Sequence, residues 1–185
     1  KKYFKHLGLK DSQLIFAPHS VDNDKFKNIN DDLLRVKFGI KEDEMLFLFA
    51  GKFHQKKNPL LLIDAFSNLN GTANHLLLVD NGELEIEMKK RVSNLPKHIQ
   101  KRIHFLDFFN QSQMPSLYAN CDVFVLPSKG PGETWGLSVN EAMASGKAVI
   151  VSDRCGCATD LINHGNNGFV FTFNDLNDLI KKMDS

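Results

Sequence analysis

Short apolar segments recur along the chain and are separated by polar stretches or by stretches with a helical period. They are rich in Val, Leu, Ile and Phe and cover residues 14–17, 45–50, 75–79, 102–106, 122–126, 148–152 and 168–171. Their composition is continuously apolar rather than alternating, which is typical of strands buried on both faces of a sheet. We therefore predict a strand at each of these segments.

Predicted helices lie between the later strands. Residues 60–66 and 84–92 follow a helical period, and residues 114–119, 137–145, 158–163 and 175–183 complete the set. Strands that alternate with helices form right-handed βαβ units around a parallel sheet. The pattern predicts an α/β fold with a doubly wound, Rossmann-like parallel sheet. Ligands bind beyond the carboxyl ends of such strands, so we expect functional residues in the loops after residues 50, 79, 106, 126 and 152.

Composition excludes several classes of protein. The 185 residues are 42% hydrophobic, which suits one domain with a sizeable core. The 23 basic and 22 acidic residues nearly balance, so we expect no nucleic-acid partner. No apolar run approaches the ~20 residues that span a bilayer, and no signal peptide is recognisable. The chain begins with Lys1-Lys2-Tyr3 rather than methionine, and we expect it to be a piece of a longer protein.

The cysteines point to a reducing compartment. Cys121, Cys155 and Cys157 form an odd set without a Cys-x-x-Cys pair. We interpret them as reduced thiols of a cytoplasmic protein. No histidine lies at finger-like spacing from them, so we expect no metal site.

Two glutamates frame the most informative segment, which runs from a glycine-rich turn into a predicted helix. Glu133 lies in the turn after the predicted strand 122–126, and Glu141 lies in the helix. A helix that begins after such a turn directs backbone N–H groups at one point, where an anionic group can bind. A carboxylate can accept two hydrogen bonds from a vicinal diol such as a ribose. Together these features indicate a site for a nucleotide-sugar.

The helical position of Glu141 supports this interpretation. On a helix that begins near Leu137, Glu141 lies beside small side chains, while Val139 and Met143 face the sheet. We therefore expect an approachable carboxylate. The alternative is that Glu141 is an ordinary exposed helix residue and Glu133 a surface turn residue.

A basic loop follows residue 50. It holds Lys52, Lys56 and Lys57, whose mobile ammonium groups suit a diphosphate. The spacing is not that of a Walker A loop, which needs a second glycine followed by Lys-Ser/Thr. The alternative is a solvated basic loop.

Several motifs follow one another in order along the chain. They are Gly51-Lys52 with Lys57-Asn58-Pro59, residues 76–82, 103–106 and 117–128, the pair Glu133-x7-Glu141 with residues 142–146, and residues 152–171. In this order they resemble the C-terminal, nucleotide-sugar-binding domain of the group 1 (family four) glycosyltransferases, which have the GT-B fold of two facing Rossmann-like domains. Upstream, residues 15–22 with Phe26 are similar to the interdomain linker of that family.

The resemblance implies a division of the chain. Residues 1–40 would be a remnant of the interdomain linker with the first strand and helix, and residues 41–185 would be the nucleotide-sugar-binding domain. The N-terminal acceptor domain would be absent, so we expect the chain as given to be catalytically inactive.

The resemblance also implies roles for individual residues. Glu133 would contact the transferred sugar, and Glu141 would hold the ribose. The donor diphosphate would be bound by two lysines and by backbone N–H groups at the start of the helix, which are Lys52, Lys57, Gly136, Leu137 and Ser138. The base would lie beside Leu106, Asp107 and Phe108. Tyr118 matches a family position, and we interpret it as a packing residue.

Four features depart from the family pattern. Lys52 stands where arginine is usual and lacks its planar fork. Asn58 replaces a usual glycine, and Trp135 replaces a usual phenylalanine. The loop between Ser128 and Glu133 is longer than is common, which leaves the identity of the sugar open.

The function implied for the full-length protein is a retaining, metal-independent transfer of a hexose-type sugar from a UDP- or GDP-type donor to a glycan or lipid-linked acceptor, without a cofactor. We expect a cytoplasmic enzyme of cell-envelope polysaccharide or glycolipid biosynthesis, with peripheral association at the inner membrane face as a variant. The alternatives are a non-catalytic nucleotide-binding module and a sugar epimerase or phosphorylase with the same architecture.

Overall fold

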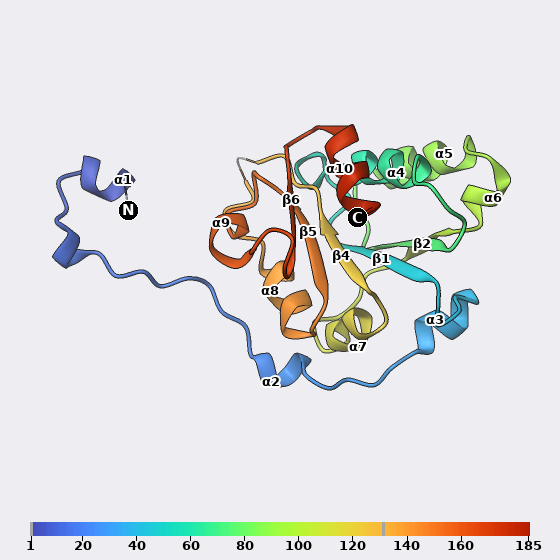
Figure 1. Ribbon diagram of the computed structural model, residues 1–185, viewed down its shortest axis with the longest axis horizontal. Helices are drawn as coiled ribbons and strands as arrows, with labels where there is room; N and C mark the ends of the chain where they lie inside the picture. Colours follow the sequence, from blue (N-terminus) through green and yellow to red (C-terminus); the bar gives the residue numbers. More distant parts are fainter. Residues whose placement is uncertain (1, 131) are drawn as a thin grey trace.

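The computed structural model describes residues 2–130 and 132–185, and its centre is a parallel sheet. The sheet has six strands in the order β3-β2-β1-β4-β5-β6 (Figure 1). All neighbouring pairs are parallel. The strands are β1 (Met45–Ala50), β2 (Asn74–Val79), β3 (Ile103–Leu106), β4 (Val123–Leu126), β5 (Ala148–Ser152) and β6 (Gly168–Phe171). The predicted doubly wound sheet is therefore confirmed.

Helices cover both faces of this sheet. One face packs against α2 (Asn23–Phe26), α3 (Leu33–Phe38), α7 (Met114–Ala119), α8 (Leu137–Ala144) and α9 (Ala158–Leu161). The other packs against α4 (Pro59–Ser67), α5 (Glu85–Ser93), α6 (Lys97–Gln100) and α10 (Leu176–Met183). Along β1, Leu46 and Leu48 enter the first core while Phe47 and Phe49 enter the second. This double burial explains why the strands are continuously apolar.

The strand order places a topological switch point between β1 and β4. The chain moves outward through β2 and β3 in one direction, and through β5 and β6 in the other. The loops that follow β1 and β4 consequently diverge to opposite faces and leave a crevice between them. The candidate lysines follow β1, and the two glutamates follow β4.

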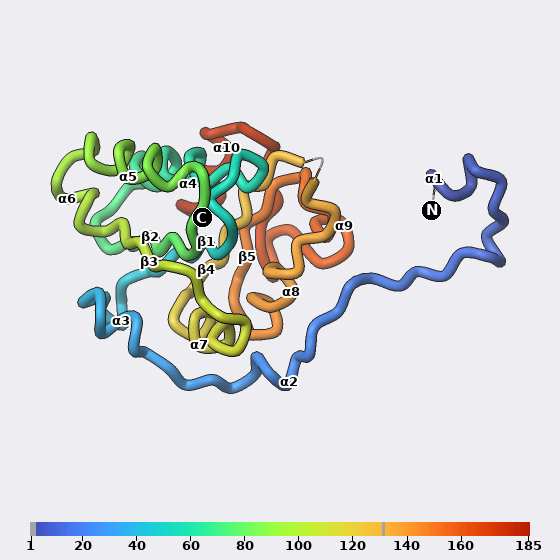
Figure 2. Tube along the Cα trace, turned by 180° about the vertical axis from the view of Figure 1, so that it is seen from behind, coloured from blue at the N-terminus to red at the C-terminus, as the bar shows by residue number. Residues whose placement is uncertain are grey.

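The N-terminal segment departs from the prediction. It contains α1 (Lys2–His6) and the short 3-10 helix η1 (Asp11–Gln13), and it extends away from the domain before reaching α2 (Figures 1 and 2). The strand predicted at residues 14–17 is wrong, because these residues run as an exposed extended segment with Ile15 92% exposed. An apolar run forms a strand only where a neighbouring strand can take its backbone hydrogen bonds, and this segment lies away from the sheet edges. The expected first strand of residues 1–40 is thus not formed, whereas α3 supplies the expected helix.

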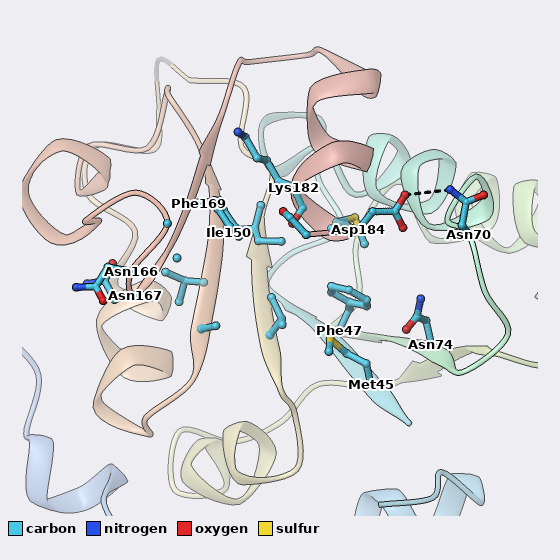
Figure 3. Close-up of a pocket in the computed structure, with 17 residues that line it drawn as sticks. Met45, Phe47, Asn70, Asn74, Ile150, Asn166, Asn167, Phe169, Lys182 and Asp184 are labelled. Atoms are coloured by element: carbon cyan, nitrogen blue, oxygen red, sulfur yellow. Dashed lines mark hydrogen bonds between the residues drawn. The ribbon is translucent and has the colours of Figure 1, made fainter. Parts of the chain in front are cut away.

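A cavity of about 440 Å³ lies at the amino-terminal edge of the sheet, opposite the switch point. Phe47, Ile150 and Phe169 contribute apolar walls, and Asn70 bonds to Asp184 beside it (Figure 3). The candidate site residues lie at the other edge.

Candidate functional site

Lys57 and Glu133 meet across the switch point. Lys57 belongs to η2 (Gln55–Lys57), which follows β1, and its ammonium forms an ion pair with Glu133 Oε2. The side chains are only 17% and 10% exposed, so water screens this pair less than a surface pair. Ser128 lies two residues after the end of β4, and its Oγ donates to the same carboxylate oxygen over 2.9 Å. No bond from the described part of the chain reaches Glu133 Oε1, which leaves that oxygen for a ligand.

The amino end of α8 lies beside this ion pair. Gly136 precedes the helix with φ 99°, a left-handed conformation that a side chain would strain. An added Cβ would also approach Leu126 Cδ2 to 3.2 Å. The predicted helix start at Leu137 is confirmed.

These groups surround one cavity of about 370 Å³. It is lined by His19, Ala50, Lys57, Glu133, Thr134, Trp135, Gly136, Leu137 and Ser138. A cation, a carboxylate and a helix amino end thus face a common space. That combination suits an anionic group attached to a polyol.

Glu141 lies under this site and not on the open surface. We expected an approachable carboxylate, but Glu141 is buried and only 9% exposed. Gln111 Nε2 donates to Oε1 over 2.8 Å, and Tyr118 OH donates to Oε2 over 2.9 Å. The alternative of an ordinary exposed helix residue is also wrong. Each carboxylate oxygen can accept a further hydrogen bond, because each has two lone pairs.

Tyr118 is more than the packing residue that we expected. It is fully buried, and its hydroxyl is bonded to Glu141. Burial is the main cause that raises the pKa of Tyr118 well above its usual range, and the negative charge of Glu141 raises it further. The hydroxyl therefore stays protonated and acts as a donor to the carboxylate at neutral pH.

Lys52 stands apart from the Lys57–Glu133 pair. Its ammonium contacts Asp80 Oδ1 over 3.0 Å and Asn81 Oδ1 over 3.1 Å, in the loop after β2. It also lies 5.5 Å from the centre of the Phe108 ring. The side chain of Lys52 is 59% exposed. Asp80 directly follows a predicted strand, in residues 80–83 that the sequence predicts to be a tight turn and helix cap rather than a binding site.

The loop after β3 contains the remaining candidates. Leu106 and Asp107 line a separate cavity of about 310 Å³ together with Phe53 and Asp80. Phe108 is 59% exposed and carries its ring toward Lys52. These residues lie on the β2–β3 side of the switch point, away from Glu133.

Asn58 explains one departure from the family pattern. It has φ 57°, and asparagine is among the few residues with a side chain that tolerate this left-handed conformation. The side chain is buried, and within the described residues Nδ2 is the buried polar atom that lacks a hydrogen-bond partner. Glycine also adopts this left-handed conformation readily, so asparagine is compatible with a position where the family usually has glycine.

The three cysteines are free thiols and are buried, although the sequence did not predict their burial. Burial raises the pKa of Cys155 to about 11 and that of Cys157 to about 12, so both thiols are protonated at neutral pH. Over residues 2–130 and 132–185, no cluster of His, Cys, Asp and Glu is arranged to hold a metal ion. Nor does any helix in these residues have the length and apolarity needed to cross a membrane.

Comparison with known proteins establishes the family. A family model described as glycosyl transferases group 1 matches residues 30–185. The chain belongs to the group 1 glycosyltransferases. It is 29% identical over 147 residues to the lipopolysaccharide 1,2-N-acetylglucosaminetransferase of Salmonella typhimurium, a match that covers 76% of this chain and 38% of that protein.

Solved group 1 and related structures share the fold. Anabaena HepE in complex with UDP and glucose matches with a TM-score of 0.77 and 26% identity, over 89% of this chain and 45% of HepE. A C-terminal domain of a group 1 protein from Francisella tularensis matches with a TM-score of 0.75 and 22% identity, over 89% of this chain and 86% of that domain. The chain spans about two fifths or less of the first curated relatives that it matches. The expected C-terminal half of a GT-B fold is confirmed.

Proposed function

We propose that this chain is the donor-binding domain of a retaining, metal-independent glycosyltransferase. The full-length enzyme would transfer a hexose-type sugar from a UDP- or GDP-type donor to a glycan or lipid-linked acceptor, with no cofactor. The observation that carries the proposal is the convergence of Lys57, Glu133 and the amino end of α8 on one cavity at the switch point. Family membership and the UDP-glucose complex of HepE support it.

The diphosphate would bind between Lys57 and the first turn of α8. The N–H groups of Gly136, Leu137 and Ser138 are close to the free end of the helix, where the macrodipole favours negative charge. As the glycosidic bond breaks, negative charge grows on the leaving diphosphate. Preorganised N–H groups and an ammonium would stabilise this charge most strongly in the transition state.

The two glutamates would act on different parts of the donor. Glu133 would accept hydrogen bonds from the transferred sugar through Oε1, because its bonds to Lys57 and Ser128 both occupy Oε2. Glu141 would accept from the ribose hydroxyls, with Tyr118 and Gln111 holding the carboxylate in place. A bound phosphate would compete with the Glu133 carboxylate for the ammonium of Lys57, and this competition would affect the affinity for the donor.

The periphery of the site would complete the donor contacts. Lys52 would leave Asp80 and Asn81 to reach the diphosphate, and Leu106, Asp107 and Phe108 would border the base. The acceptor would bind to the N-terminal domain of the full-length enzyme, so we expect the chain alone to transfer no sugar. We place the enzyme in the cytoplasm or at the inner face of the membrane, in cell-envelope polysaccharide or glycolipid biosynthesis.

Isothermal titration calorimetry with UDP and GDP tests the site. We expect one of the two to bind, and Lys57→Ala and Glu141→Ala each to weaken binding about 10-fold or more, since a hydrogen bond to a charged group contributes about 1.5–3 kcal/mol. Lys101→Ala, at an exposed lysine next to α6, is the matched control and should bind as the original chain does. Unchanged affinity in both site variants would show that the site is assigned wrongly.

A further inference from the structure

The segment that precedes the domain reaches into the candidate site at His19. This residue lies in the extended stretch between η1 and α2, which approaches α8 from outside the domain (Figure 1). Its ring lies against the indole of Trp135, with ring centres 5.5 Å apart and planes inclined at 48°. His19 therefore lies against the turn that carries Glu133.

Asn140 of α8 holds this contact together. Its Oδ1 accepts from Trp135 Nε1 over 2.7 Å, and its Nδ2 donates to the backbone carbonyl of His19 over 3.2 Å. One amide side chain thus satisfies the indole N–H and anchors the preceding segment. The tryptophan that replaces the family's usual phenylalanine is what supplies the N–H for this arrangement.

His19 lines the same cavity as Lys57, Glu133 and Ser138. Among the described residues that line it, neither Glu141 nor the loop at residues 106–108 appears. If the donor binds as proposed, this cavity holds the distal phosphate and the sugar, and the nucleoside lies elsewhere. An imidazole offers a donor to a phosphate oxygen and either a donor or an acceptor to a sugar hydroxyl.

We propose that His19 is a donor-specificity residue that contacts the distal phosphate and the transferred sugar, and that Asn140 is its positioning residue. The inference rests on the proposed function, because it takes the cavity as part of a nucleotide-sugar site. It adds a contact from outside the Rossmann-like domain proper. In this arrangement Trp135 supports the imidazole through ring contact.

Ligands of increasing length test this inference. UMP, UDP and UDP-glucose, with GMP, GDP and GDP-glucose as the parallel set, are titrated calorimetrically against the chain and against His19→Ala. We expect His19→Ala to weaken the nucleotide-sugar at least 3-fold and to leave the nucleoside monophosphate within 2-fold. His19→Gln, which keeps a hydrogen-bond donor, should recover part of the loss. His6→Ala, in the exposed α1, is the matched control and should leave all affinities unchanged.

Asn140→Ala separates positioning from general weakening. We expect Asn140→Ala to weaken the nucleotide-sugar more than the nucleoside monophosphate, but by a smaller factor than His19→Ala does. The double variant should bind the nucleotide-sugar no more weakly than His19→Ala alone. Thermal unfolding of each variant checks that the domain remains folded. The inference is overturned, and the proposed function stands, if the original chain binds a nucleotide-sugar and His19→Ala binds it with the same affinity. The same conclusion follows if His19→Ala weakens the nucleoside monophosphate as much as the nucleotide-sugar. If the original chain binds none of the six ligands, both are overturned.

Discussion

Tyr118 holds the second glutamate of the site in place. Its hydroxyl and the amide of Gln111 donate to the two oxygens of Glu141, whose position in the core would otherwise leave a carboxylate short of partners. A buried carboxylate is costly unless it is hydrogen-bonded. The same two donors orient the carboxylate for a ligand, so stability and binding depend on one group.

We expect Tyr118→Phe to lower the free energy of unfolding by about 1–3 kcal/mol, because Glu141 Oε2 loses its buried donor. Nucleotide affinity should also fall, since the carboxylate gains rotational freedom. Urea unfolding and calorimetry measure the two effects. Tyr3→Phe in the exposed α1 is the matched control, and equal stability of the two variants would contradict this role for Tyr118.

A pair of histidines predicts how stability depends on pH. His104 Nε2 and His75 Nδ1 lie 3.0 Å apart, and the His104 ring stacks on Phe38 of α3. Burial, followed by the charge of His75, lowers the pKa of His104 from 6.5 to about 4. The unfolded chain then binds a proton at higher pH than the folded chain does. The contribution of neutral His104 to the free energy of unfolding is therefore fully present above about pH 6.5, and it is lost as the pH falls toward 4.

We expect the loss to amount to roughly 1–2 kcal/mol, because partial exposure of the ring reduces the effect of the full shift. His104→Phe keeps the ring against Phe38 and removes the titrating group. Its unfolding free energy should fall less than that of the original chain between pH 7 and pH 4. His98→Ala, at an exposed histidine of α6, should retain the original slope. Parallel pH profiles of the original chain and His104→Phe would refute this explanation.

At the scale of elements, the turn before α8 is held by the turn before α9. Gly156 N donates to the carbonyl of Glu133, and Cys157 N donates to the carbonyl of Trp135. A Cβ at residue 156 would lie 1.8 Å from Thr134 O, which is backbone and cannot rotate away. Glycine at this position is therefore required by the close approach of the two turns.

We expect Gly156→Ala to displace the Glu133 turn, to cost about 1–3 kcal/mol of stability as an overpacked contact, and to weaken binding of a nucleoside diphosphate. Gly132→Ala is the matched control, because its Cβ would meet only Lys56 Cδ at 3.6 Å. Unfolding and titration of both variants provide the comparison. A Gly156→Ala chain with normal stability and affinity would be inconsistent with the described turn.

The sequence predicts an element well where the element packs against one of the two hydrophobic cores, because burial requires a regular pattern of apolar residues. The strands of the sheet and the helices α4, α5, α7, α8, α9 and α10 lie at or close to the predicted ranges. The sequence does not predict α6, because this helix is short and buries one side chain, that of Ile99. The apolar run at residues 14–17 misleads because composition alone does not tell whether a neighbouring strand is present.

At the scale of the whole molecule, strand order brings the site together. Lys57 and Glu133 are separated by 76 positions in the chain and meet because β1 and β4 are neighbours. The sequence could indicate both residues, since each follows a predicted strand. It could not indicate Ser128, Gln111 or Asp80 as their partners, because those pairings depend on rotamers and loop paths that no local pattern encodes.

The central claim is that a nucleoside diphosphate binds at the switch point between β1 and β4. A crystal structure of the chain with UDP or GDP, whichever binds more tightly, tests it most directly. We expect the distal phosphate within hydrogen-bond distance of Lys57 and of the N–H groups at residues 136–138, with the ribose hydroxyls on Glu141. A nucleotide bound elsewhere, or bound at the switch point without contact to Lys57 and Glu141, would contradict the account.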